Sequence, residues 1–199
     1  MSLDILKNIN WVDILIGAIS IRIIYIGTKN GFIVEFFKWI GVLFSIFITF
    51  HYYSNLAKIL QSRLPISGSI AQSLCFVLLW SLVFLMFKLI REGMMLMLKI
   101  QAHSLLDKWG GLLVSILRSI LIGSLVLVFL QVLGVEYITK NVRKSFLNSY
   151  LFDIAPKVYE VSYDGFVDKF FPSEKLNLAV FKLKTVDLKD SPHPKNEWA

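Results

Sequence analysis

Four long apolar stretches dominate the chain, and each approaches the length of a membrane-crossing helix. A bilayer core about 30 Å thick needs about 20 helical residues to cross it. The predicted spans cover about residues 11–28, 31–50, 70–90 and 109–134. They predict an all-α integral membrane protein whose four transmembrane helices form one domain over residues 1–135.

Turn-forming residues separate these stretches. Lys29, Asn30 and Gly31 lie between the first two spans, where a glycine can adopt backbone angles that other residues avoid. They predict a tight helical hairpin. After Ile90 the sequence stays apolar but gains charges, and a methionine-rich segment follows. This mixture predicts an amphipathic helix at the membrane interface before the fourth span.

The composition changes again after Val135. A basic group (Lys140, Arg143 and Lys144) is followed by aromatic residues among polar ones. Residues 136–172 therefore predict an amphipathic helical tail, broken near Pro156 and ending by Pro172. Residues 173–199 are expected to be a flexible C-terminus, since the last part of the chain combines prolines with charges.

Composition agrees with lipid as the solvent. Hydrophobic residues make up 56% of the 199 residues and charged residues 18%, against about 25% charged in soluble domains. The net charge is +7, and the basic residues mostly flank apolar runs, where they meet anionic head groups. No basic cluster forms a recognisable nucleic-acid-binding module. The lipid bilayer, and not nucleic acid, is therefore the expected partner.

The sequence offers no catalytic, metal or cofactor site. Its single cysteine, Cys75, lies inside an apolar run, and no His, Cys or carboxylate spacing resembles a metal site. No phosphate loop, nucleophile elbow or zinc-protease motif is present either. We therefore predict a protein that is not an enzyme.

Charged residues inside the spans need an explanation, because each costs about 2.5–3.5 kcal/mol at the bilayer centre. If the first hairpin closes tightly, Arg22 lies level with Glu35 and Lys38, and the three can form an ionic cluster. That cluster would either lock the hairpin or serve ion conduction or gating. Asp13, in the first turn of its helix, can interact favourably with the helix dipole or take part in proton transfer.

The fourth span carries small residues every four positions: Gly111, Ser115, Ser119 and Gly123. Such ridges let helix backbones approach closely in lipid. Arg118 lies on nearly the same face as Asp107, eleven residues earlier, and is predicted to be buried against another helix or subunit. Backbone carbonyls or Glu35 could satisfy it there, in a packing role or a transport role.

Several short motifs in order resemble the bacterial colicin V production protein family. They are Trp11-Val12-Asp13, Asn30 to Glu35, His51-Tyr52-Tyr53, Leu106 to Gly111 and Leu117-Arg118-Ser119. The resemblance covers roughly residues 10 to 172. The family pattern around the fourth span is Asp-Arg-x-x-Gly-x-x-x-Gly-x-x-Arg-Gly. Asp107, Gly111 and Arg118 match it, whereas Lys108, Ser115 and Ser119 replace an arginine and two glycines.

The first hairpin departs from the family pattern in one place. Asn30-Gly31 replaces the family's Arg-Gly, with Lys29 beside it. A role that needs a bidentate arginine grip on an anion is therefore not supported at position 30.

The resemblance implies a multi-pass protein of the bacterial inner membrane, linked to colicin V production or export and to envelope homeostasis. Some relatives carry an extracytoplasmic protease domain after similar spans, which points to a C-terminus outside the cytoplasm. The flanking basic residues leave the orientation open. We carry two hypotheses: an oligomeric scaffold, assembled through the fourth-span ridge or with an envelope or secretion protein, and a channel or transporter component.

Overall fold

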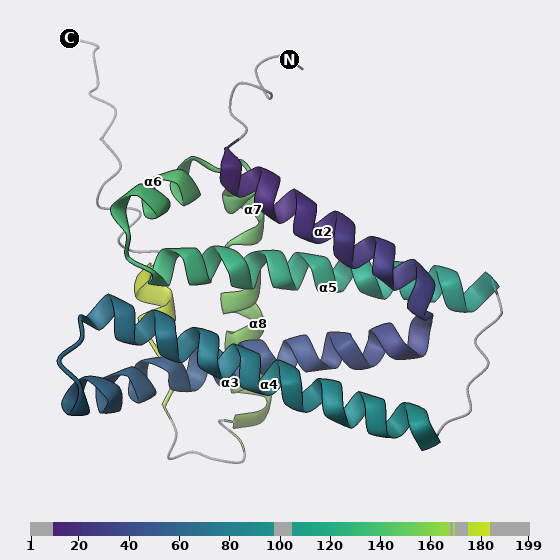
Figure 1. Cartoon of the computed structure of the whole chain (residues 1–199), viewed down its shortest axis with the longest axis horizontal. Coiled ribbons are helices and arrows are strands. Elements are labelled where there is room, and N and C mark those ends of the chain that lie inside the picture. The colour runs from purple at the N-terminus through teal and green to yellow at the C-terminus, as the bar shows by residue number, and fades with distance from the viewer. Residues whose placement is uncertain (1–9, 98–104, 168, 170–174, 184–199) are drawn as a thin grey trace, which may run out of the picture.

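The computed structural model describes residues 10–97, 105–167, 169 and 175–183, and within them it contains helices and no strand (Figure 1). Four helices are long and apolar enough to cross a membrane. They are α2 (Trp11–Asn30), α3 (Phe32–Arg63), α4 (Gly68–Met97) and α5 (Leu105–Val132). The shorter α6 (Glu136–Lys144), α7 (Asn148–Leu151), α8 (Ile154–Ser162) and the π-helical η1 (Tyr163–Val167) follow. The predicted all-α membrane protein is confirmed.

The long helices do not pair in the order of the sequence. Helix α2 lies along α5, and α3 packs against both α4 and α5, whereas α2 and α3 diverge from their common turn (Figure 1). The prediction of a tight hairpin between the first two spans is therefore wrong. The physical reason is that Gly27 and Gly111 lack side chains, so the backbones of α2 and α5 approach closely.

Two spans are longer than predicted. Helix α3 has 32 residues, about 48 Å at 1.5 Å per residue, which exceeds the bilayer core. Its last turns expose Lys58, Gln61 and Arg63, which is the pattern expected of a helix end outside the bilayer core. Helix α4 continues without a break to Met97, so the first part of the predicted interfacial helix, residues 91–97, belongs to α4. Residues 98–104 lie outside the described residues.

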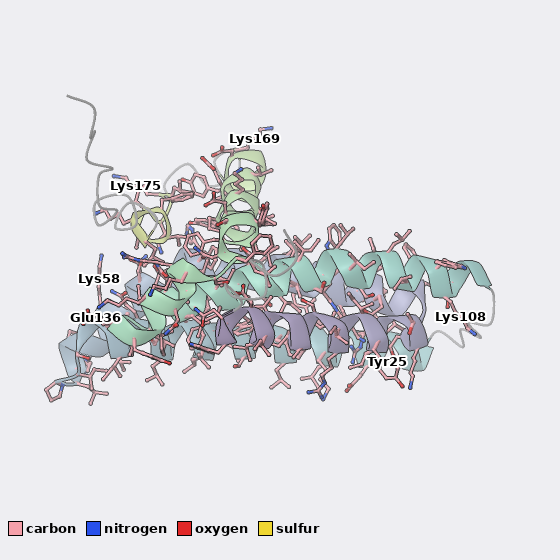
Figure 2. The ribbon with its side chains drawn as sticks, turned by 90° about the horizontal axis from the view of Figure 1, so that it is seen from above. Tyr25, Lys58, Lys108, Glu136, Lys169 and Lys175 are labelled. Carbon is pink, nitrogen blue, oxygen red and sulfur yellow. The ribbon has the colours of Figure 1, made fainter. Side chains whose placement is uncertain are left out.

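The helices after α5 form what we call the cap, namely residues 136–167 and 175–183. Helix α8 lies across the long axis of the bundle rather than along it (Figure 2). The tail is broken at 145–147 and at 152–153, and the second break lies three residues before Pro156, near which a break was predicted. Pro156 lies in the first turn of α8, where no intrahelical bond needs its missing N–H group. Pro172 lies outside the described residues.

Residues 175–183 contribute to the core. Val180 is 1% exposed. The Asn177 side-chain amide donates to the Phe50 carbonyl at 2.6 Å, and the Asn177 N–H donates to the Tyr159 hydroxyl at 3.0 Å. The predicted flexible C-terminus is thus wrong for residues 175–183, while 184–199 lie outside the described residues.

The largest apolar core lies where the spans meet the cap. Phe50, Phe76, Leu125 and Tyr159 are buried there together. Helix α4, by contrast, exposes a long apolar surface that includes Leu78, Leu82, Leu85 and Leu89. In a membrane protein such a surface faces lipid. The cap end of the bundle is therefore the best packed part of the molecule.

Candidate functional site

A buried carboxylate, Glu35, joins three helices near the turn between α2 and α3. Its side chain is 0% exposed. Glu35 Oε1 accepts hydrogen bonds from Lys38 Nζ at 2.7 Å and from Asn30 Nδ2 at 2.8 Å. On the other oxygen, Arg118 Nη2 lies 2.9 Å from Oε2 as an ion pair. That contact lacks hydrogen-bond alignment, so its attraction is that of two opposite charges.

Each partner comes from a different position in the fold. Lys38 follows Glu35 by one helical turn on α3, Asn30 ends α2, and Arg118 reaches in from the middle of α5. Arg118 is 7% exposed. Glu35, one of the two predicted partners of Arg118, lies within ion-pair distance of it. Asn30 was predicted only as a turn residue. Apart from the presence of a side-chain amide, nothing in the sequence indicated its hydrogen bond to Glu35.

Arg22 does not belong to this cluster. Its side chain is exposed, and no ion pair between Arg22 and Glu35 is present. The prediction assumed that α2 and α3 run side by side, which would bring Arg22 level with Lys38. Because α2 packs on α5 instead, Arg22 occupies the outer side of the bundle.

Asp107, from α5, binds the backbone of the turn between α2 and α3. Its Oδ1 accepts a hydrogen bond at 2.8 Å from the backbone N–H of Phe32, one of the N–H groups that the start of α3 leaves unpaired. Gly31 has φ 77°, and a Cβ atom there would overlap the Asp107 carboxylate. Of the three predicted turn residues, only Gly31 is outside a helix. Lys29 Nζ lies 4.3 Å from the centre of the Tyr25 ring.

Two cations, Lys38 and Arg118, flank the single buried carboxylate of Glu35, and Asp107 caps the start of α3 beside them. Removing one member of a buried ion pair leaves a charge that is expensive in an apolar medium. The arrangement can therefore hold α2, α3 and α5 in one register.

Asp13 lies at the opposite end and has different partners. It is 9% exposed. Its Oδ1 accepts from Ser145 Oγ at 2.5 Å and from Leu147 N–H at 3.0 Å. Its Oδ2 accepts from Asn10 N–H at 3.0 Å and Phe146 N–H at 3.3 Å. The predicted structural role fits this geometry, and the unpredicted part is that Asp13 ties the start of α2 to the break between α6 and α7.

The small-residue ridge of α5 packs against α2 of the same chain. A Cβ at Gly111 would lie 2.9 Å from the Gly27 carbonyl oxygen, and one at Gly123 would lie 3.3 Å from Ile16 Cγ2. The hydroxyls of Ser115 and Ser119 donate to carbonyls of their own helix, both at 2.8 Å. The ridge is thus a helix-packing surface, but α2 occupies it.

A second polar group, which the sequence analysis missed, lies between α3 and the cap. His51 is 3% exposed, and its Nδ1 lies 3.0 Å from the Tyr159 hydroxyl. The distance along the chain hides such a pair from a single sequence. Among the described residues no group of three or more His, Cys, Asp or Glu side chains is placed to hold a metal ion.

These features define a class: a multi-pass, all-α membrane protein with a charge network locking three of its spans. A family model for the colicin V production protein matches residues 12–156. The chain therefore belongs to the colicin V production protein family. A search of curated proteins and a search of solved structures each found no match.

Proposed function

We propose that the protein is a non-enzymatic scaffold of the bacterial inner membrane that supports toxin production or export, or envelope homeostasis. Membership of the colicin V production family supports the biological setting. The observation that carries the scaffold proposal is the buried carboxylate of Glu35. It accepts hydrogen bonds from Asn30 and Lys38 and pairs with Arg118, so it joins α2, α3 and α5. Breaking a buried ion pair is strongly destabilising, so these contacts support a role in holding the helices together.

A scaffold needs partners, and we propose that this one assembles with copies of itself or with an envelope protein. The α5 ridge is used inside the chain, since Ser115 packs directly on Gly27. Self-association through that ridge would require α2 to leave it. The proposed assembly therefore uses other surfaces, with the ridge keeping each subunit folded.

Crosslinking in native membranes tests this proposal, with Ser115→Leu and Ser115→Ala as a matched pair. Crosslinking of the wild type should capture one dominant species, either a second copy or one non-self protein. Ser115→Leu should unfold the subunit, because Ser115 touches Gly27. Ser115→Ala should leave fold and crosslinking unchanged. A folded Ser115→Leu monomer would show that the ridge is an intermolecular contact, and absence of any crosslinked species would contradict the scaffold.

A channel or transporter component is the second candidate. The observation that favours it is that Lys38, a partner of the buried Glu35, keeps 17% of its side chain exposed. The network therefore reaches the outside of the packed helices. Reconstitution in planar bilayers, with Arg118→Ala as the variant, decides between the two. Reproducible conductance altered by Arg118→Ala would support the channel, and silence of correctly folded protein across voltage and tension would favour the scaffold.

A further inference from the structure

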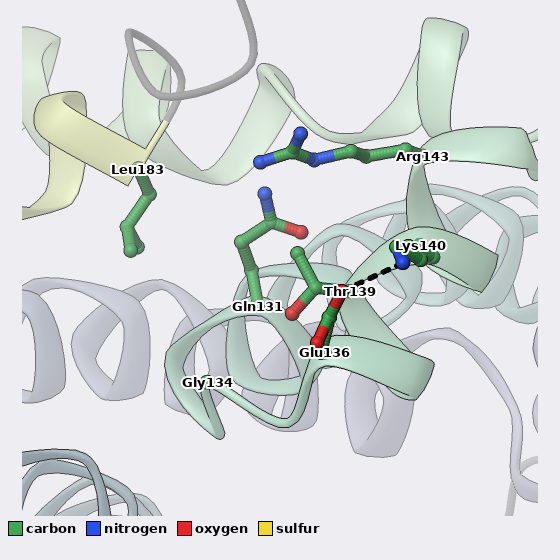
Figure 3. Close-up of a pocket in the computed structure, with 7 residues that line it drawn as sticks. All are labelled: Gln131, Gly134, Glu136, Thr139, Lys140, Arg143 and Leu183. Carbon is green, nitrogen blue, oxygen red and sulfur yellow. Dashed lines mark ion pairs between the residues drawn. The ribbon is translucent and has the colours of Figure 1, made fainter. Parts of the chain in front are cut away.

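A pocket opens where the fourth span ends and the cap begins. It is open on one side and has a volume of about 360 Å³ between the last turn of α5, helix α6 and the segment near Leu183 (Figure 3). Gly134, with φ 64°, turns the chain sharply between α5 and α6 and forms one edge. The pocket is separate from the Glu35 network, which lies at the other end of the bundle.

Hydrogen-bond donors line this pocket. Figure 3 shows the Arg143 guanidinium extended across it, with the Gln131 amide on the facing wall. Lys140 lies beside them, and its Nζ is 2.6 Å from Glu136 Oε1. The hydrogen bond and the positive charge of Lys140 lower the pKa of the exposed Glu136 carboxyl. A bound anion can therefore contact the Arg143 guanidinium, and it can compete with the Glu136 carboxylate for the Lys140 ammonium group.

Gln131 is the strongest indication that the pocket has an occupant. The residue is 6% exposed, and its Oε1 has no hydrogen-bond partner among the described residues. A buried polar atom without a partner is destabilising, so native proteins rarely keep one without a reason. The amide can turn by 180° about its terminal bond and present either its oxygen or its NH₂ group to a ligand.

The position of the pocket identifies the chemistry of that ligand. Gln131 directly follows the apolar run from Leu125 to Leu130, so it lies where a span leaves the hydrocarbon core. Phosphate groups of lipids occupy this depth. A guanidinium fits a phosphate with two parallel hydrogen bonds, and Leu183 supplies an apolar wall beside it.

We propose that this pocket binds a phosphate ester, the head group of an anionic phospholipid, between the Arg143 guanidinium and the Gln131 amide. Arg143 carries the charge recognition, a hydroxyl of the head group can donate to the Gln131 Oε1 that lacks a partner, and Lys140 adds a second cation. This inference does not rest on the proposed scaffold function, because a channel would present the same pocket.

The test uses the full chain in a neutral detergent, with phosphatidylglycerol or phosphatidylcholine added. Thermal unfolding and native mass spectrometry report binding. Phosphatidylglycerol should raise the melting temperature and remain bound, because a ligand of the folded state stabilises it, and phosphatidylcholine should do so much less. Arg143→Gln should weaken phosphatidylglycerol binding about tenfold or more. Lys144→Gln is the matched control, because Lys144 is exposed and does not line the pocket.

Glycerol 3-phosphate and inorganic phosphate separate the two sources of the ligand. If they stabilise the protein as well as the lipid does, the pocket takes a soluble phosphate ester, and the lipid assignment is overturned while the anion chemistry stands. Equal effects of phosphatidylglycerol and phosphatidylcholine, or equal losses in Arg143→Gln and Lys144→Gln, would overturn the proposal.

Gln131→Leu keeps the test decisive if Arg143→Gln does not fold. Replacing a buried, unpartnered amide by an apolar side chain of similar size should raise the melting temperature of the lipid-free protein. The same variant should reduce the shift that phosphatidylglycerol produces. A higher melting temperature with an unchanged lipid shift would show that Gln131 does not contact the ligand.

Discussion

The two ends of the bundle each bury a carboxylate, and they satisfy it in opposite ways. Glu35 meets two cations and one amide, Lys38, Arg118 and Asn30, which come from three helices. Asp13 meets no cation through its hydrogen bonds. It accepts three backbone N–H groups and the Ser145 hydroxyl.

This difference separates two ways of holding a fold together in lipid. An ion-paired carboxylate fixes the register of whole helices, but removing its cation leaves the negative charge of the carboxylate buried without a partner. A carboxylate held by N–H and O–H dipoles fixes a local backbone conformation, and the loss of one donor leaves the others in place. We therefore expect substitutions at the Glu35 end to disturb the spans and substitutions at Asp13 to disturb mainly the cap. Four variants test this comparison.

Arg118→Ala should have the largest effect, a loss of about 3–5 kcal/mol in the free energy of unfolding, because it leaves Glu35 buried without its deepest cation. Denaturant unfolding in mixed micelles measures it. In a double-mutant cycle, Glu35→Gln with Arg118→Ala should cost clearly less than the sum of the single changes. Additive losses would mean that the pair is not coupled.

Gly31→Ala should have the second largest effect, a loss of about 3 kcal/mol in the free energy of unfolding. A side chain at φ 77° is strained, and the new Cβ would overlap the Asp107 carboxylate that caps α3. The same unfolding experiment applies, with Gly17→Ala as the control, since a Cβ at Gly17 would meet no atom within 4 Å. Equal effects at the two glycines would contradict the structure of this turn.

Asp13→Asn should cost less, about 1–3 kcal/mol, because an amide keeps one acceptor oxygen but points N–H groups at other N–H groups. Hydrogen exchange should show the loss locally. The amides of Phe146 and Leu147 should exchange faster, while the Leu133 amide, bonded to the Phe129 carbonyl, should stay protected. Faster exchange throughout α5 would show that Asp13 holds the spans as well.

Gly134→Ala should have the smallest effect, about 1–2 kcal/mol. The residue has φ 64°, and the atoms its Cβ would meet are the side chain of Ser69, which can move. Thermal unfolding measures the change, with Gly165→Ala as the cap control because a Cβ there would meet nothing within 4 Å. A loss as large as that of Gly31→Ala would mean that the cap turn is as constrained as the Asp107 turn.

The sequence predicted the elements better than their pairing. Hydrophobic length alone located four spans, and the charge of Arg118 pointed to Glu35, because a buried arginine needs an acid. The sequence could not show that α2 packs against α5 and not against α3, because the residues around Arg22 do not determine which helix is its neighbour. The Asp13 contacts with residues 145–147 were hidden for the same reason, since backbone N–H groups carry no residue signature.

The pairing of α2 with α5 also sets an order of events during synthesis. Helix α2 reaches the bilayer long before α5 exists, and its surface at Gly27 has no ridge to pack on until about 80 more residues have been made. During that interval Glu35 has Asn30 and Lys38 as partners from the chain already made, and Arg118 arrives last. Completion of the fourth span thus supplies both the surface on which α2 packs and the last partner of Glu35, and a chain that stops before it leaves three helices without either contact.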